Sequence, residues 1–248
     1  MLLPQRRAMI TGAASGIGAA IALLFAREGA ALMLADRNEA GLHAIVERCR
    51  GLGAVCHGVL ANVGAPDDAR RGVDACLRRL GGIDILVNNA GMLTQARCED
   101  LTLEMWDEMM AVDLRSVFLA SQRALPYMRR QRWGRIINIA SQLGLKGGAE
   151  LCHYAAAKAG VIGFTKSLAL EAATDNVLVN AIAPGPITTP LVEGISDAWK
   201  IAKAKELPLG RFGFADEVAP VALLLASEPG GNLFVGQTLG PNAGDVMP

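Results

Sequence analysis

The sequence predicts one α/β domain, a doubly wound parallel sheet with helices on both of its faces. Short apolar segments alternate along the chain with longer segments whose apolar residues recur at helical spacing. The short segments are apolar throughout, as in strands that are buried on both faces of a parallel sheet. No linker, charge block, low-complexity stretch or internal repeat interrupts this alternation, so residues 1–248 are predicted to form a single domain.

The first half of the chain supplies several of these alternating segments. Strands are predicted over Ala8–Thr11, Ala31–Ala35, Ala54–Val59 and Ile83–Val87. Helices are predicted over Ile17–Glu28, Glu39–Leu52 and Asp67–Leu80. The spacing of Ile17, Ile21 and Leu24 places their side chains on one helical face, which is expected to pack against the sheet.

The second half continues the pattern with longer helices. Strands are predicted over Arg135–Ala140, Val177–Ala183 and Gln237–Leu239. Helices are predicted over Thr102–Arg130, Cys152–Ala173 and Ala215–Ser227. A further helical excursion, Thr189–Glu206, is closed by Pro208, and residues 189–208 are predicted to form a lid over the substrate.

The composition excludes several classes of protein. The chain has 248 residues, and 24 Lys and Arg balance 24 Asp and Glu to a net charge of zero. Nucleic acids and anionic membranes both require a basic surface, so neither is an expected partner. An apolar fraction of 52% excludes general disorder. No apolar run reaches the roughly 18 residues that predict a membrane span.

The cysteines and histidines predict neither disulfides nor a metal site. The number of cysteines is odd, at 5, and no C-x-x-C pair occurs, which is typical of free thiols in a reducing compartment. The 3 histidines show no metal-ligand spacing with one another or with the cysteines. We therefore expect a cytoplasmic protein without a bound metal.

A glycine-rich turn follows the first predicted strand and opens the first helix. Its candidate cofactor-binding residues are Gly12, Ser15, Gly16, Ile17 and Gly18. Glycines allow a tight turn, close backbone approach to a pyrophosphate and close contact between helix and strand. The helix N-terminus then directs free N–H groups and its positive dipole end at the phosphates. A turn without a ligand is the alternative, because the spacing differs from G-x-G-x-x-G.

An acidic residue at the end of the second strand favours NAD over NADP. Asp36 lies where a carboxylate accepts hydrogen bonds from the adenosine ribose hydroxyls and repels a 2′-phosphate. Arg37 follows it and would attract that phosphate, so the two residues act in opposite directions. We give the carboxylate more weight and predict NAD. The alternative for Asp36 is a surface turn residue.

Several motifs together give the chain its family resemblance. They are TGAASGIG at 11–18, NNAG at 88–91, Ser141, YAAAK at 154–158 and PGPITT at 184–189. In this order and spacing the sequence closely resembles the short-chain dehydrogenase/reductase family over nearly the whole chain. The resemblance implies a Rossmann-type fold and hydride transfer between a nicotinamide and a carbonyl compound or secondary alcohol.

The residues of the YAAAK motif suit that chemistry on physical grounds as well. A tyrosine has a free pKa of about 10, too high for an effective base at neutral pH. A nearby lysine ammonium stabilises the phenolate and lowers that pKa. Tyr154 and Lys158 are four residues apart and lie on one helical face. We predict Tyr154 as the acid and base, Lys158 as the group that tunes it and holds the nicotinamide ribose, and Ser141 as the residue that orients the substrate oxygen. The alternative is a chance spacing on a helix.

Two positions depart from the family pattern. The long helix normally carries an Asn that supports a proton-relay water, and here the stretch reads Val112-Asp113-Leu114. Asp113 is predicted to serve as the relay residue, and its alternative is an ion pair with Arg115 or another cation. Asn62 stands before Val63 where an acidic residue is usual, and both are predicted to contact the adenine.

The resemblance implies further cofactor contacts at the carboxyl ends of two other strands. These contacts are Asn89, Ala90, Gly91, Pro184, Gly185, Ile187 and Thr189. Polar amides and a glycine at a strand's carboxyl end suit the crevice in which such sheets bind ligands. For the NNAG segment the alternative is a turn whose Asn side chains cap backbone groups.

The expected substrate contacts are Ser141, Gln142, Leu143, His153 and Tyr154. A core or solvent-facing position is the alternative for His153. The mixed character of this region leaves a 3-oxoacyl thioester, a simple alcohol and a polyol open as substrates. The tail GQTLGPNAG at 236–244 resembles that of 3-oxoacyl-thioester reductase-like members.

Assembly and partners are predicted from the resemblance and from the long helices. Apolar residues on these helices, including Met109, Val117 and Ile162, are candidates for a subunit interface, and the family implies a homotetramer. Arg129, Arg130 and Arg132 form a basic cluster that is either an acyl carrier protein docking site or a solvated helix end. A non-catalytic nucleotide-binding regulatory protein on the same fold is the alternative function.

Overall fold

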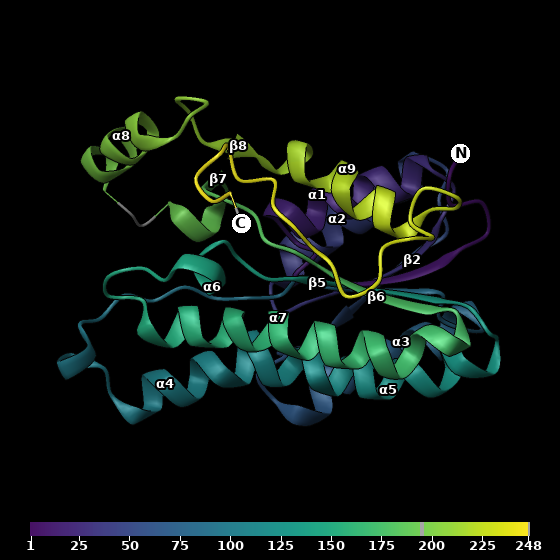
Figure 1. The fold of residues 1–248 in the computed structure, drawn as a ribbon. Helices are drawn as coiled ribbons and strands as arrows, with labels where there is room; N and C mark the ends of the chain where they lie inside the picture. The colour runs from purple at the N-terminus through teal and green to yellow at the C-terminus, as the bar shows by residue number, and fades with distance from the viewer. Residues whose placement is uncertain (194–195, 248) are drawn as a thin grey trace.

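A seven-stranded parallel sheet forms the centre of the molecule (Figure 1). The computed structural model describes residues 1–193 and 196–247, and the strand order is β3-β2-β1-β4-β5-β6-β9. The strands are β1 Arg7–Thr11, β2 Ala31–Asp36, β3 Cys56–Leu60, β4 Ile85–Asn88, β5 Gly134–Ile139, β6 Val177–Ile182 and β9 Thr238–Leu239. A separate parallel pair joins β7 Ile187–Thr188 to β8 Gly213–Phe214. The predicted fold class, a single doubly wound α/β domain, is confirmed.

Helices cover both faces of the sheet. One layer contains α1 Gly16–Arg27, α2 Glu39–Gly51 and α9 Ala215–Ala226, which share a hydrophobic core with the strands. The other contains α3 Pro66–Leu80, α5 Ser116–Arg130 and α7 Cys152–Ala172. The central strands β4, β5 and β6 are buried at every residue, because helices cover the apolar side chains on both faces of the sheet and exclude water from them. The edge strand β3 differs from the prediction, since Gly58 and Leu60 are exposed there.

The strand order creates a crevice beside β1. The chain adds β2 and β3 on one side of β1 and then returns to place β4 on its other side. The connections after β1 and β4 therefore diverge at their carboxyl ends, which leaves an opening there. Both the glycine turn and the NNAG segment lie at this switch point.

The long helix predicted over Thr102–Arg130 is interrupted in the structure. It consists of α4 Leu103–Met110, a π-helical turn at Ala111–Arg115, and α5. A π turn inserts an extra residue into the helical ladder and rotates the side chains around it. This turn carries Asp113, whose side chain is fully buried. Sequence periodicity predicts the helix but not this local change of pitch.

Two short helices lie near the carboxyl edge of the sheet, one packed against α7 and the other apart from the main layers. They are α6 Leu143–Lys146 and α8 Asp197–Glu206. Single 3₁₀ turns occur at Cys98–Asp100, Ala173–Asp175 and Pro190–Val192. Of the predicted excursion over 189–208, residues 194 and 195 lie outside the described residues. Among the residues that the structure describes, no helix is long and apolar enough to cross a bilayer.

Several residues expected at a subunit interface are instead part of the core. Met109, Val117 and Ile162 are 0%, 3% and 6% exposed, so they pack inside one chain. Phe118 remains 42% exposed and makes an edge-on contact with Phe164, with ring centroids 6.3 Å apart. The prediction for the first three residues is therefore wrong, because Val117 and Ile162 pack next to the ends of β5 and β6, and Met109 packs against α7.

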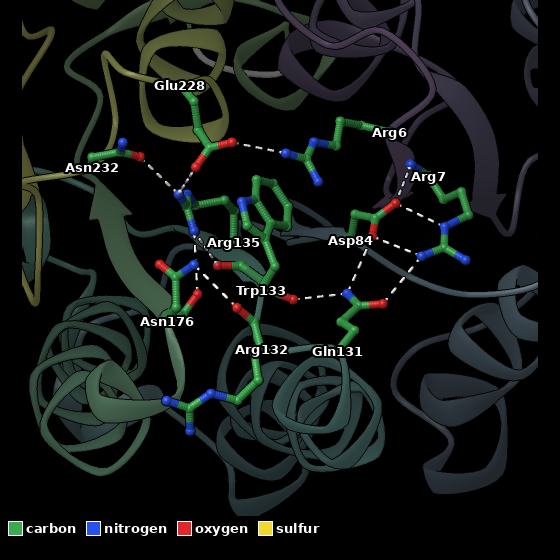
Figure 2. A network of polar contacts seen from close by, with 11 residues as sticks. Arg6, Arg7, Asp84, Gln131, Arg132, Trp133, Arg135, Asn176, Glu228 and Asn232 are labelled. Atoms are coloured by element: carbon green, nitrogen blue, oxygen red, sulfur yellow. Dashed lines mark hydrogen bonds and ion pairs between the residues drawn. The ribbon is translucent and has the colours of Figure 1, made fainter.

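A polar network closes the opposite edge of the sheet, where the strands begin (Figure 2). Asp84, just before β4, accepts hydrogen bonds from the Arg7 backbone N–H and from Arg7 Nε, each at 2.8 Å. Its other oxygen accepts from Arg7 Nη2 at 2.8 Å and from Gln131 Nε2 at 3.1 Å. The carboxylate thus joins the starts of β1 and β4 to the end of α5.

Arg135, at the start of β5, forms the second half of this network. Its side chain is 1% exposed, and burial lowers the pKa of its guanidinium to about 10. Asn232 accepts a hydrogen bond from it at 2.9 Å, and Glu228 lies 3.5 Å away. The guanidinium also packs over the ring of Trp133, 4.3 Å from the centroid, with Arg6 at 3.6 Å from the same ring.

Replacing Asp84 tests this network. Asp84→Ala is expected to lower the free energy of unfolding by about 2–3 kcal/mol, because it leaves several donors of Arg7 and Gln131 without an acceptor. Urea unfolding followed by circular dichroism measures this change. The matched control is Glu47→Ala, which removes an exposed pair with Arg50 and should cost less than about 0.5 kcal/mol. Equal effects of the two substitutions would contradict the network's role.

Candidate active site

A cavity of about 680 Å³ opens at the carboxyl edge of the sheet, above the switch point. Its walls come from the turns that follow β1, β2, β3, β4, β5 and β6, and from α7 and α8. The lining includes Gly12, Ser15, Gly16, Ile17, Asp36, Arg37, Asn62, Val63, Asn89, Ala90, Gly91, Asp113, Ser141, Gln142, Leu143, Tyr154, Lys158, Pro184, Gly185, Ile187 and Thr189. Two of the predicted site residues, Gly18 and His153, are not part of this lining.

The glycine turn depends on glycine for its backbone conformation and for its close contacts with neighbouring segments. Gly12 and Gly16 have φ of +64° and +53°, in the left-handed region that favours glycine. A Cβ on Gly12 would lie 2.8 Å from the Ala90 Cα, and one on Gly16 would lie 3.3 Å from Thr189 Cβ. A Cβ on Gly18 would overlap the Gly12 carbonyl oxygen. Gly18 therefore permits close packing of α1 on the turn and is not a wall residue.

At the end of the cavity next to β2, the Asp36 carboxylate is held in a fixed orientation. Asp36, half-buried at the end of β2, accepts hydrogen bonds from the backbone N–H groups of Ala14 and Asn38, each at 2.9 Å. These bonds hold the carboxylate in place and leave further lone pairs for hydroxyl donors. Arg37 is exposed beside it. Asn62 Oδ1 accepts from the Gly64 N–H at 3.1 Å, so its amide N–H₂ group is the part available to a ligand.

Asn89 in the NNAG segment joins the ends of two strands. Asn89 Nδ2 donates to the Thr11 carbonyl at 2.9 Å and to the Gly12 carbonyl at 3.0 Å. Its backbone N–H donates to the Thr11 hydroxyl at 2.9 Å. The Asn89 amide therefore links the end of β4 to the glycine turn. The Asn89 side chain thus caps backbone groups, while Asn89, Ala90 and Gly91 also line the cavity.

Below the cavity floor lies a buried polar chain that sequence reasoning missed. Asn88 Nδ2 donates to Asn138 Oδ1 at 2.8 Å and to the Ser121 hydroxyl at 3.1 Å. Asn138 Nδ2 in turn donates to the Thr165 hydroxyl at 2.9 Å. These residues join β4, β5, α5 and α7. The available signal was a polar residue inside an otherwise apolar strand, as Asn138 is, because a buried amide must find partners.

Tyr154 and Lys158 project from one face of α7 into the cavity wall. Both are nearly buried, at 7% and 4% exposure. Lys158 Nζ lies 5.6 Å from the centroid of the Tyr154 ring and donates to the Ile139 carbonyl at 3.0 Å. Ser141 follows β5, and its hydroxyl accepts from the Leu143 N–H at 3.1 Å. The structure thus brings together the three side chains that the sequence singled out.

Asp113 faces Lys158 directly. Its Oδ2 lies 3.1 Å from Lys158 Nζ, and its Oδ1 accepts from the Met92 backbone N–H at 2.9 Å. The pairing occurs inside the protein, where both side chains are at most 5% exposed. The predicted alternative of an ion pair with a cation is the arrangement found, and the cation is Lys158. Arg115 instead donates to the Gly64 carbonyl at 2.9 Å.

This arrangement sets the proton affinities of the site. The pKa of Tyr154 is raised. Burial is the main cause and the Asp113 carboxylate adds to it, while the Lys158 ammonium and a hydrogen bond with Ser141 act to lower the pKa. For Lys158, burial acts to lower the pKa, but Asp113 and Tyr154 together outweigh burial and the pKa is raised. Burial raises the pKa of Asp113 against the opposing effect of Lys158. Lys158 therefore stays an ammonium beside the phenol.

His153 does not face the cavity, which corrects its prediction as a substrate contact. The ring is fully buried, and its Nε2 hydrogen-bonds the Thr94 hydroxyl at 2.8 Å. Because His153 precedes Tyr154 on α7, its side chain points about 100° away around the helix, toward the loop after β4. Burial lowers its pKa, which keeps the imidazole neutral. His153 is therefore a core residue, which was the alternative prediction for this position.

The cavity fits a dinucleotide by the chemistry of its walls. Gly12 and Gly16 line the cavity with backbone and no side chain, and the N-terminus of α1 adds free N–H donors for a pyrophosphate. Asp36 supplies acceptors for a ribose, and Lys158 supplies donors for another. No group of three His, Cys, Asp or Glu residues able to hold a metal ion occurs among the described residues.

Comparisons with known proteins agree with this geometry. Residues 6–199 match the family model described as short chain dehydrogenase. The chain is 41% identical over 247 residues to the 3-oxoacyl-(acyl-carrier-protein) reductase FabG of Thermotoga maritima, with 100% of each chain covered. It is 40% identical over 247 residues to the corresponding reductase of Vibrio cholerae, again with 100% of each chain covered.

Solved structures show the same similarity in three dimensions. A short-chain type dehydrogenase/reductase from Mycobacterium marinum matches with a TM-score of 0.94 and 34% identity, covering 99% of this chain and 97% of that one. Levodione reductase matches with a TM-score of 0.92 and 33% identity, covering 98% of both chains.

Proposed function

Because the chain belongs to the short-chain dehydrogenase/reductase family, we propose that it interconverts a carbonyl compound and a secondary alcohol with NAD, using Tyr154 as acid and base. The family assignment makes it an oxidoreductase of CH–OH groups with a nicotinamide cofactor. The observation that carries the finer proposal is the buried Lys158 ammonium, 5.6 Å from the Tyr154 ring at the wall of the cavity.

The chain's own residues handle the proton and the orientation of the substrate. Tyr154 gives its phenolic proton to the carbonyl oxygen during reduction and takes it from the hydroxyl during oxidation. Lys158 stabilises the phenolate by its charge, and Ser141 donates a hydrogen bond to the reacting oxygen. A bound nicotinamide supplies or accepts the hydride. Burial of these side chains excludes water and strengthens their mutual electrostatic interaction.

Asp113 acts on this pair through Lys158. Its carboxylate compensates the buried ammonium and holds Nζ in position. It also accepts protons and hydrogen bonds, so it stands where a relay from Lys158 toward solvent would begin. We assign it this relay and positioning role in place of the usual Asn.

NAD is the proposed cofactor, with NADP as the alternative. Asp36 is held by two backbone N–H groups at the end of β2, so its carboxylate cannot swing away from a 2′-phosphate. Placing that phosphate beside a fixed carboxylate would cost free energy. Exposed Arg37 offsets part of this cost. The preference for NAD over NADP therefore depends on the Asp36 carboxylate outweighing the Arg37 guanidinium.

Two substrate classes have support of different kinds. The names of the relatives favour a 3-oxoacyl thioester carried on a protein. The basic cluster offers little to such a carrier, because Arg129 and Arg132 pair with Asp175 at 3.1 Å and 2.7 Å. Arg130 packs over Tyr127, 4.4 Å from the ring centroid. We therefore favour a small carbonyl compound or alcohol and keep the thioester as the second candidate.

We also propose a cytoplasmic homotetramer. All five cysteines are free thiols, which suits a reducing compartment. Trp106 on α4 and Leu170 on α7 are 37% and 81% exposed, and Phe118 on α5 adds apolar surface on the same helical layer. Such surface favours association between copies.

Removing the Tyr154 hydroxyl tests the proposed function. Tyr154→Phe is expected to lower kcat/KM by about 10²–10⁴-fold, because the proton donor is lost. The measurement is nicotinamide absorbance with a panel of ketones, 3-oxoacyl thioesters, secondary alcohols and polyols. NADH affinity, followed by fluorescence, should stay within about twofold of the original protein. Near-normal turnover by this variant would refute the assignment of Tyr154.

Replacing Asp113 tests its electrostatic role. The Asp113 carboxylate raises the Tyr154 pKa. In Asp113→Asn the Tyr154 phenolate, which also raises the Lys158 pKa, becomes the partner of the ammonium. The Tyr154 pKa should therefore fall. Oxidation requires the phenolate and increases as pH rises through this pKa. The rising limb of log kcat/KM for alcohol oxidation should therefore move to lower pH. Asp107→Asn, an exposed position on α4, is the control and should leave the limb in place. A limb that stays fixed or moves to higher pH in Asp113→Asn would contradict this role.

Replacing Asp36 tests the cofactor choice. Asp36→Ala removes the ribose acceptor and leaves Arg37 to attract a 2′-phosphate, so the ratio of NADP to NAD affinity should rise about tenfold or more. Fluorescence titration with NADH and NADPH measures both dissociation constants. Glu39→Ala, two residues beyond Arg37 on α2, is the control. An unchanged ratio in Asp36→Ala would exclude Asp36 as the ribose ligand.

A further inference from the structure

Asp245 reaches the part of the cavity that is lined by Lys146, Trp199, Lys203 and Phe212, which we call the substrate end. Asp245 Oδ2 accepts hydrogen bonds from Lys146 Nζ at 2.7 Å and from Gln142 Nε2, and its Oδ1 accepts from Lys203 Nζ at 2.9 Å. Lys146 ends α6, Lys203 lies on α8, and Gln142 directly follows Ser141. Asp245 thus joins two walls of the cavity that are otherwise far apart in the sequence.

The tail is held firmly where it presents this carboxylate. The Gly185 N–H donates to the Pro241 carbonyl at 3.1 Å, and a Cβ on Gly185 would lie 2.6 Å from the Asn242 Cα. Asn242 Nδ2 donates to the Val246 carbonyl at 2.8 Å, and its Oδ1 accepts from the Gly244 N–H at 3.0 Å. The Asp245 side chain is only 8% exposed. Its position is therefore set by packing and hydrogen bonds and is not that of a frayed terminus.

The charges at the substrate end of the cavity balance. Among the described residues, the cations that line the cavity are Arg37, Lys146, Lys158 and Lys203. Arg37 lies at the ribose end, and Lys158 is paired with Asp113. Lys203 also pairs with Glu206 at 3.0 Å. The substrate end thus holds two lysines and two carboxylates, Asp245 and Glu206, and their formal charges sum to zero.

We propose that Asp245 is a specificity-determining residue, which neutralises Lys146 and Lys203 and thereby selects uncharged carbonyl substrates over those that carry a carboxylate. This proposal rests on the proposed carbonyl–alcohol activity. Asp245 is not itself part of the cavity wall, so it acts through the two lysines, which are. A carboxylate on the substrate would have to compete with Asp245 for donors that are already engaged.

The neighbouring side chains suit an uncharged group. Trp199 on α8 and Phe212 line the same end, with ring centroids 6.4 Å apart. Leu143 and Leu191 add apolar wall. An uncharged carbonyl compound can desolvate these surfaces without leaving a charge unpaired. Without Asp245, Lys203 would keep only Glu206 and Lys146 would lose its partner, so a net positive charge beside the same apolar wall would favour an anion.

The experiment compares two substrates that differ in charge and hardly in shape, 4-oxopentanamide and the 4-oxopentanoate anion. The quantity measured is the ratio of their kcat/KM values, amide over anion, with kcat and KM determined separately. Asp245→Asn should lower this ratio about tenfold or more, which is about 1.4 kcal/mol, mainly through a lower KM for the anion. Lys146→Gln makes the site more negative and should raise the ratio instead.

The matched control is Asp175→Asn. Asp175 also stands between two cations, Arg129 and Arg132, but far from the cavity lining. Its loss should leave the ratio within about twofold. Asp245→Glu, which keeps the charge, should restore most of the original ratio. Opposite shifts in Asp245→Asn and Lys146→Gln support the proposal, and an unchanged ratio in either folded variant overturns it.

Lys146→Gln keeps the test decisive where Asp245→Asn does not fold, because Lys146 is already 31% exposed and its loss removes a single contact of Asp245. Calorimetric titration of the protein with NAD and each 4-oxo compound separates the two proposals. If neither these compounds nor any member of the substrate panel is turned over but the ratio of dissociation constants shifts as stated, the carbonyl–alcohol activity fails and the role of Asp245 stands. If both compounds are turned over and the ratio does not shift, only the role of Asp245 fails.

Discussion

The arrangement of the site depends on one constraint, the burial of the Lys158 ammonium. A buried cation is costly unless a charge and hydrogen-bond acceptors surround it. Lys158 has both, the Asp113 carboxylate at 3.1 Å and the Ile139 carbonyl at 3.0 Å. Meeting this need requires the π turn between α4 and α5, the end of β5 and one face of α7 to converge at one point. The same convergence brings Ser141 and Tyr154 to the wall of the cavity.

The same principle of local charge compensation recurs along the cavity. Asp36 is oriented by backbone N–H groups, Lys158 by Asp113, and the two lysines of the substrate end by Asp245 and Glu206. Asp113 and Asp245 come from segments distant in sequence, Glu206 lies three residues from Lys203 on α8, and the groups that hold Asp36 belong to the backbone. The Lys158 ammonium consequently lies between the Asp36 carboxylate at one end of the cavity and, at the other end, two lysines whose charges are balanced by two carboxylates.

The opposite edge of the sheet shows what the fold needs for stability alone. Asp84 and Arg135 tie the starts of the strands together by hydrogen bonds and by packing over Trp133. None of these residues lines the main cavity in the part of the chain that the structure describes. The amino ends of the strands are therefore free to be optimised for packing, while the carboxyl ends carry the chemistry, as expected for a doubly wound sheet.

The sequence by itself determined the alternation of strands and helices, the glycine turn, and the spacing of Tyr154 and Lys158 on one helical face. These features depend on local periodicity and on neighbours within a turn, which the order of residues states directly. Only the tertiary structure decided that Asp113 faces Lys158, that His153 turns into the core, and that Asp245 reaches Lys146 and Lys203. Those outcomes depend on the π turn, on how α7 packs, and on where the tail crosses the sheet. Contacts between such distant segments follow from packing in space, so residue spacing along the chain could not predict them.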